Sequence, residues 1–145
     1  MIITLKFKKT KNDFDEKFKK STTNALMKTG YRILKEAHYL APIDHGALVG
    51  SGYAQVGKNI VFNPNKEAAS DDKPPIPDNS DIKDLELRVG YSVPYAAQLH
   101  ENKFNPGAKS IQKGLTYPGY KWLSKATKKI NTKELFKEFL QDEFE

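Results

Sequence analysis

The sequence contains no cysteine among its 145 residues, which excludes a disulfide framework, a thiolate nucleophile and a zinc site built on Cys ligands. It also lacks an apolar run long enough to cross a bilayer, so no membrane partner is expected. The N-terminus alternates apolar and polar residues, whereas a secretory signal needs an unbroken apolar stretch. The glycines at positions 46, 50 and 52 do not match a P-loop, and no HExxH metal motif is present.

Charge is distributed unevenly along the chain, whose formal net charge is +6. Residues 1–36 hold ten Lys/Arg against four Asp/Glu, and the remaining residues hold fourteen of each. A second basic stretch, residues 103–133, contains no acidic residue, while the last residues, "ELFKEFLQDEFE", are acidic. A uniformly basic face is typical of nucleic-acid binders, but opposite patches suit contacts between protein subunits at least as well.

Hydrophobic periodicity predicts the order of strands and helices. Alternation in residues 2–8 predicts a strand, and apolar or small residues spaced by three or four predict a helix from near Asp13 to about residue 40. Further strands are predicted at 47–56, 58–63 and 85–92, and helices at 94–102, 120–130 and from Thr132, which is expected to cap the last helix. Residues 63–84 are expected to form an extended surface loop, and residues 103–119 an irregular connection.

This order predicts an α+β fold, in which a mainly antiparallel β-sheet packs against a long N-terminal α-helix and is followed by short C-terminal helices. A chain of this length is expected to form a single domain over residues 1–145, with residues 131–145 as a C-terminal helical tail. Gly30 is the one weak position in the long helix, because glycine has poor helix propensity.

The segment "APIDHGALVGS", residues 41–51, places an aspartate beside a histidine and raises the question of catalysis. Adjacent residues in extended chain point in opposite directions, so Asp44 and His45 are poorly placed to act as a dyad. Pro42 ends the helix, Asp44 can accept hydrogen bonds from nearby backbone N–H groups, and Gly46 can adopt positive φ. Ser51 falls in a predicted strand without a nucleophile-elbow pattern. A structural turn is therefore favoured over an active site.

The three histidines, His38, His45 and His100, lack the i, i+4 spacing with which two histidines of one helix bind a metal ion. A site formed by all three histidines is the alternative interpretation. His100 is expected to contact the last carbonyl groups of its short helix. No cofactor, no metal and no catalytic residue is predicted. A hydrolase that uses His45 or His100 remains the competing enzymatic hypothesis.

A nucleic-acid-binding module is the main alternative to a structural protein. Residues 103–129 combine seven lysines with Phe104, Tyr117, Tyr120 and Trp122, a mixture capable of phosphate contact and base stacking. The segment has no arginine, however, and Tyr120 and Trp122 share the apolar side of a predicted helix with Leu123 and Ala126.

Three segments, in order, resemble the tail-completion or head–tail joining proteins of tailed bacteriophages, often described as gp10-like minor capsid proteins. They are "EAHYLAPIDHGALVGSGYA", "LRVGYSVPYAAQLHEN" and "GYKWLSKATKKI". The positions that match are Ala41, Pro42, Asp44, Gly46, Leu48, Ser51, Val89, Gly90, Pro94, Tyr95, Ala96, His100, Glu101, Trp122, Leu123 and Ala126. The chain departs from the family pattern at His45, where a small threonine is usual, and in its longer 63–84 loop.

The resemblance implies a virion structural protein without catalytic residues. Such proteins form rings, commonly hexameric, at the neck, between the head connector or adaptor and the tail tube, after assembly in the host cytoplasm. The basic first half of the chain is also compatible with weak contact with packaged DNA. A ring subunit is expected to present complementary edges, because head-to-tail contacts close when the rotation per subunit divides the circle.

Overall fold

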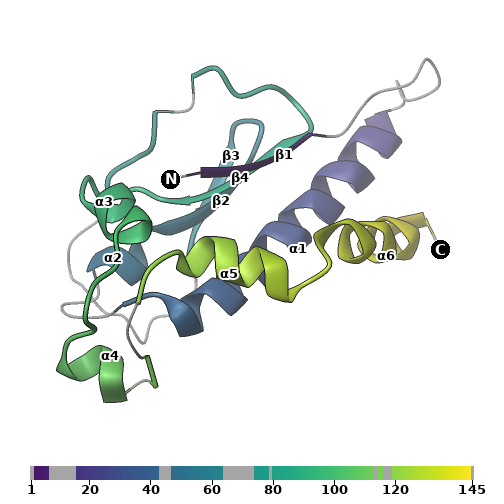
Figure 1. The fold of residues 1–145 in the computed structure, drawn as a ribbon. Coiled ribbons are helices and arrows are strands. Elements are labelled where there is room, and N and C mark those ends of the chain that lie inside the picture. The colour runs from purple at the N-terminus through teal and green to yellow at the C-terminus, as the bar shows by residue number, and fades with distance from the viewer. Residues whose placement is uncertain are drawn as a thin grey trace.

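The computed structural model describes residues 2–6, 16–42, 47–63, 74–78, 80–112, 114–115 and 119–144 (Figure 1). In chain order its elements are β1 (Ile2–Lys6), α1 (Glu16–Leu40), α2 (Ala47–Gly50), β2 (Gly52–Val56), β3 (Asn59–Phe62), β4 (Glu86–Tyr91), α3 (Ala96–Glu101), α4 (Ala108–Gln112), α5 (Trp122–Lys129) and α6 (Thr132–Phe144). The predicted α+β class is confirmed. Within these ranges no helix is long and apolar enough to cross a membrane.

The four strands form one sheet in the order β1-β4-β2-β3, and all neighbouring strands are antiparallel. Val89 lies opposite Ile3 on one side and opposite Ala54 on the other, so these three side chains share one face. Ile3 and Leu5 pack against the hydrophobic core, which confirms the alternation predicted for β1. Phe7, the third apolar residue of that pattern, lies outside the described residues.

Helix α1 lies across this apolar face of the sheet and also contacts α5 and α6 (Figure 1). It has 25 residues, which corresponds to about 38 Å at 1.5 Å per residue. Its buried positions step by three and four as predicted: Thr22, Ala25, Leu26, Thr29, Gly30, Ile33, Leu34 and Ala37. The start predicted near Asp13 lies outside the described residues. Of these, the side chains of Leu26, Ile33, Leu34 and Ala37 join one hydrophobic core with Leu87, Val89, Trp122, Leu123 and Ala126.

Residues 47–50 form a helical turn, α2, and the strand predicted to begin there begins only at Gly52. The Ser51 N–H donates to the carbonyl oxygens of Ala47 and Leu48, each at 3.1 Å, so this stretch closes a helical turn before pairing with β4 begins at Gly52. Ser51 therefore lies at the junction of α2 and β2. A tight turn joins β2 to β3: Gly57 has φ +55°, and Val56 pairs with Asn59 across a two-residue loop.

The later helices differ from prediction mainly at their boundaries. α3 begins at Ala96, two residues after Pro94, because residues 94–95 form a turn. The last helix was expected to be capped by Thr132, but Asn131 Oδ1 accepts a hydrogen bond from the Glu134 N–H (3.4 Å), so the cap lies one residue earlier. The connection predicted to be irregular contains one helical turn, α4, on which Ser110 is buried.

The second face of the sheet is also partly covered, which the sequence did not indicate. Glu86, which alternates with the apolar residues of the strand predicted at 85–92, is only 5% exposed. Its carboxylate lies 3.1 Å from the guanidinium of Arg88, which also contacts both carboxylate oxygens of Asp81 at 2.9 and 3.1 Å. The Arg88 guanidinium lowers the pKa of Asp81 below its usual range. The described part of the predicted loop, residues 74–78 and 80–84, contains neither helix nor strand and is held to the sheet by this arginine.

Candidate functional site

Ser51 joins the first two of the three resembling segments through its backbone and its hydroxyl. The side chain is completely buried, and its hydroxyl donates to the carbonyl oxygen of Leu48 at 2.8 Å. The Ser51 hydroxyl oxygen also accepts a hydrogen bond from the backbone N–H of Val93 at 3.4 Å. The backbone carbonyl oxygen of Ser51 accepts one from the Ser92 N–H at 3.2 Å. The end of α2 is thereby bound to the chain that leaves β4. Ser51, the residue before β2, is therefore connected to the residues that follow β4.

The second segment continues from this junction into α3. Leu87, Val89 and Tyr91 point toward α1, and Gly90 faces the other way between β1 and β2. After the turn, Tyr95 is 45% exposed and Ala96 is 1% exposed, so the tyrosine ring is open to solvent while the alanine packs into the core.

The third segment meets the second at His100 and Trp122. The Trp122 side chain is completely buried and packs edge-on against the rings of His100 (4.9 Å between centroids) and Tyr91 (5.7 Å). The carbonyl oxygen of His100 accepts a hydrogen bond from Lys121 N at 2.8 Å, immediately before α5 begins. Residues far apart in sequence thus form one buried junction, called the three-segment junction below and comprising Ser51, Tyr91, His100 and Trp122.

The prediction that His100 contacts the last carbonyl groups of its helix is wrong. It is 3% exposed, and its Nδ1–H donates to the carboxylate of Glu101 at 2.7 Å. This hydrogen bond lowers the pKa of the exposed Glu101. The correction follows from burial: the imidazole ring is taken up by the indole of Trp122, so the nearest exposed carboxylate supplies its polar partner.

Several buried polar atoms in and beside the junction make no hydrogen bond of normal geometry among the described residues. They are Tyr91 Oη, Ser92 Oγ, His100 Nε2 and Trp122 Nε1. Burial also raises the pKa of the Tyr91 phenol above its usual range, because the charged phenolate is poorly solvated there.

We expect Tyr91→Phe to change the free energy of unfolding by no more than about 1 kcal/mol near neutral pH, because it removes a buried hydroxyl that makes no hydrogen bond of normal geometry and lies beside the indole of Trp122. An unfolded tyrosine titrates near pH 10, about where deprotonation begins to favour the unfolded chain. Wild-type stability from Tyr91 is therefore complete below about pH 10 and is lost as pH rises toward the higher folded pKa. Urea unfolding at about pH 8 and about pH 11 should show a smaller alkaline loss for the variant. A clear loss of stability near neutral pH would contradict this account.

The remaining residues of the first segment divide between the core and the part not described. Ala41 is completely buried, Pro42 is half-buried and Leu48 belongs to the core. Asp44, His45 and Gly46 lie outside the described residues, so their role in a turn stays a prediction. In the third segment Leu123 and Ala126 are completely buried beside Trp122.

The described side chains give the junction no catalytic geometry. Both hydrogen bonds of the Ser51 hydroxyl are to backbone groups, whereas a nucleophile needs a base within hydrogen-bond reach. His38 is buried with its ring beside Tyr39, and its Nδ1 lies 3.4 Å from Asn63 Nδ2. Within the described ranges, no three His, Asp or Glu side chains are grouped to hold a metal ion.

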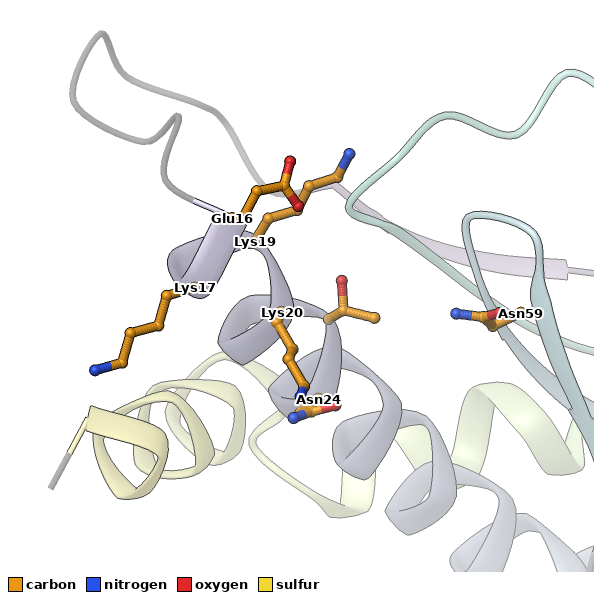
Figure 2. Close-up of a pocket in the computed structure, with 7 residues that line it drawn as sticks. Glu16, Lys17, Lys19, Lys20, Asn24 and Asn59 are labelled. Carbon is orange, nitrogen blue, oxygen red and sulfur yellow. The ribbon is translucent and has the colours of Figure 1, made fainter.

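A polar groove of about 650 Å³ lies between the first turns of α1 and the β2–β3 hairpin (Figure 2). Its lining residues are Glu16, Lys17, Lys19, Lys20, Thr23, Asn24 and Asn59. Lys19 forms an ion pair with Asp84 (2.9 Å), which raises the pKa of its ammonium group. Figure 2 shows Lys17 extending away from Asn59, so Lys19 and Lys20 are the cations nearest the hairpin side. The groove thus carries the ammonium groups of Lys19 and Lys20 together with the carboxylate of Glu16.

Sequence reasoning did not single out Tyr91, although the alternation at 85, 87 and 89 reaches position 91 in phase. It also did not identify the α1 groove, because Asn59 approaches Lys19 and Thr23 only through the packing of the hairpin beside α1. No protein-family model matches the chain, and neither the curated proteins nor the solved structures give a match to it.

Proposed function

We propose that this chain is a structural protein of a tailed-bacteriophage virion, which forms or docks onto an oligomeric ring at the head–tail junction during tail completion. Its partners would be the head connector or adaptor and the tail-tube proteins, and its location the virion neck after assembly in the host cytoplasm. A hexamer is the stoichiometry that the family resemblance implies. The protein would have no enzymatic activity in this role.

The three-segment junction is the observation that supports this proposal most directly. Ser51, His100 and Trp122 come from the three segments that carry the resemblance and lie 49 and 22 positions apart in sequence, yet they belong to connected contacts. The Ser51 hydroxyl forms hydrogen bonds with backbone groups, and the rings of His100 and Trp122 pack against each other in the core. Such a junction gives a rigid scaffold, which is what a ring subunit needs and what a substrate site does not require.

Docking to virion necks tests the proposal. We expect the purified chain to co-sediment with necks that lack it, to add a ring visible by negative-stain microscopy, and to turn over no substrate. Light scattering at several concentrations should show self-association in the absence of necks if the chain forms the ring by itself. A chain that ignores connectors and tail tubes in every preparation would overturn the proposed function.

Nucleic-acid binding is the second candidate, and the α1 groove is the observation that favours it. Residues 103–129, which the sequence favours for nucleic-acid binding, offer little for base stacking. Trp122 is completely buried, and the Tyr120 ring lies beneath the ammonium groups of Lys121 and Lys125, at 5.4 and 5.3 Å. Tyr117 lies outside the described residues. Tight binding to short duplex DNA that survives physiological salt and weakens on Lys20→Ala would favour this function over the neck role.

A further inference from the structure

The two edges of the sheet are of opposite direction. With four strands in the order β1-β4-β2-β3 and every neighbouring pair antiparallel, β1 and β3 run oppositely. A second copy placed beside the first in the same orientation would therefore set its β1 antiparallel to β3 of the first. An even number of alternating strands makes such head-to-tail extension possible without reversing the sheet.

The backbone groups on the open side of β3 follow from its hairpin. A two-residue loop makes Val56 and Asn59 a hydrogen-bonded pair, so the pairs alternate and Ala54–Val61 is the next one bonded. The hydrogen bond from Asn63 N to Gly52 O (2.6 Å) agrees with this phase. The N–H and C=O groups of Ile60 and Phe62 consequently point away from β2, toward the open edge.

The same reasoning assigns the open side of β1. The hydrogen bonds from Gly57 N to Glu86 O (3.3 Å) and from Ser92 N to Ser51 O (3.2 Å) show which residues of β4 bond to β2. Leu87 and Val89 must then bond to Leu5 and Ile3 of β1. The backbone groups of Ile2, Thr4 and Lys6 are left pointing outward.

The two edges also agree in the face that their side chains occupy. Ile60 and Phe62 of β3 and Ile2 and Thr4 of β1 all have side chains on the sheet face opposite α1, by their register with β2 and β4. Residues paired across a continuous sheet must have side chains on the same face. An antiparallel contact with Ile60 opposite Thr4 and Phe62 opposite Ile2 satisfies both the backbone direction and the faces.

The two edges have few of the features that usually prevent such pairing. β3 reads "NIVF", with no charged residue, no proline and no bulge in its register with β2. β1 has one lysine, and its Ile2 side chain is 49% exposed. Across the described ranges, no backbone hydrogen bond from another segment reaches the outward groups of Ile2, Thr4, Ile60 or Phe62.

We propose that copies of this chain join head to tail by antiparallel pairing of β3 of one copy with β1 of the next, so that their sheets become continuous around a ring. This inference rests on the proposed ring function and identifies the surface that builds it. The occupant of each edge is a second copy of the same chain. Phe62 and Ile2 form the apolar pair of the contact. The same register places Lys6 opposite Lys58 of the neighbour, and this like-charge pair opposes the contact at its exposed end.

Proline substitutions at outward positions test the pairing, because each removes one intermolecular N–H donor and leaves the ladder within the chain intact. We expect Ile60→Pro and Thr4→Pro each to weaken self-association by roughly tenfold or more, measured by light scattering and sedimentation. Ile60→Thr keeps the N–H and is the matched control, which should assemble like the wild type. Circular dichroism and urea unfolding of each variant report whether the subunit itself remains folded.

A mixing experiment separates this contact from a two-fold one. Ile60→Pro retains an open β1 edge and Thr4→Pro retains an open β3 edge, so an equimolar mixture should give a 1:1 complex that grows no further. A Thr4→Pro variant that still dimerises alone through β3 would overturn the head-to-tail pairing. Assembly of both folded variants at wild-type strength, or a wild-type chain that stays monomeric at the highest attainable concentration, would overturn it as well.

The neck experiment distinguishes failure of this pairing from failure of the proposed function. If the chain binds necks but both proline variants build the same ring, the function stands and the edge contact is wrong. If the wild type self-associates through these edges but ignores necks, the contact stands and the neck function is wrong.

Discussion

Trp122→Ala should reduce the free energy of unfolding by about 3 to 5 kcal/mol, a large fraction of the stability of an ordinary domain. The indole is completely buried and packs against the rings of Tyr91 and His100 while its helix contacts α1. Its removal leaves a cavity where the second and third segments meet. Urea unfolding followed by circular dichroism measures the loss, because Trp122 is the single tryptophan and the variant has no indole fluorescence.

Trp122→Phe should cost clearly less than Trp122→Ala, since it preserves an aromatic ring and removes an indole N–H that has no partner among the described residues. Lys128→Ala, on the exposed side of the same helix, is the surface control and should change stability by no more than about 0.5 kcal/mol. A loss below about 1 kcal/mol for the alanine variant would mean that the junction collapses easily around the missing ring.

Gly30→Ala should destabilise the protein by about 1 to 3 kcal/mol, although alanine has the better helix propensity by about 1 kcal/mol. A Cβ built at Gly30 would lie 2.9 Å from Ala54 Cβ and 2.9 Å from Leu87 Cδ1. Leu87 can change rotamer, but Ala54 Cβ moves only with the backbone of β2. The glycine that weakens the isolated helix is therefore what allows α1 to approach the sheet closely.

The double variant Gly30→Ala with Ala54→Gly tests this cause. It transfers the methyl group from strand to helix, so the two changes should be coupled and the pair should be less destabilised than the sum of the single variants. Chemical denaturation of the four proteins supplies the cycle. Additive losses, or a stabilised Gly30→Ala, would show that the close contact does not limit helix packing.

Local patterns predicted much of the fold because the periodicity of a strand or helix is visible within a few residues. The alternation of Ile3 and Leu5 and the steps of Thr22, Ala25, Thr29 and Ile33 predicted β1 and α1 with their buried faces. The strand predicted from residue 47 was wrong in its start, because the backbone before Gly52 closes a helical turn and the partner strand β4, far away in sequence, sets where sheet pairing begins.

The candidate site was harder to predict than the elements that carry it. The sequence alone determined that Ser51, His100 and Trp122 belong to the three segments that carry the family resemblance. It also excluded a cysteine-based site. Only the tertiary structure decided that these residues meet, that Tyr91 joins them, that Glu86 is buried against Arg88, and which backbone groups of β1 and β3 point outward. These features arise from contacts between segments many residues apart, and the free energy of such contacts depends on strand register and helix placement, which local periodicity does not encode.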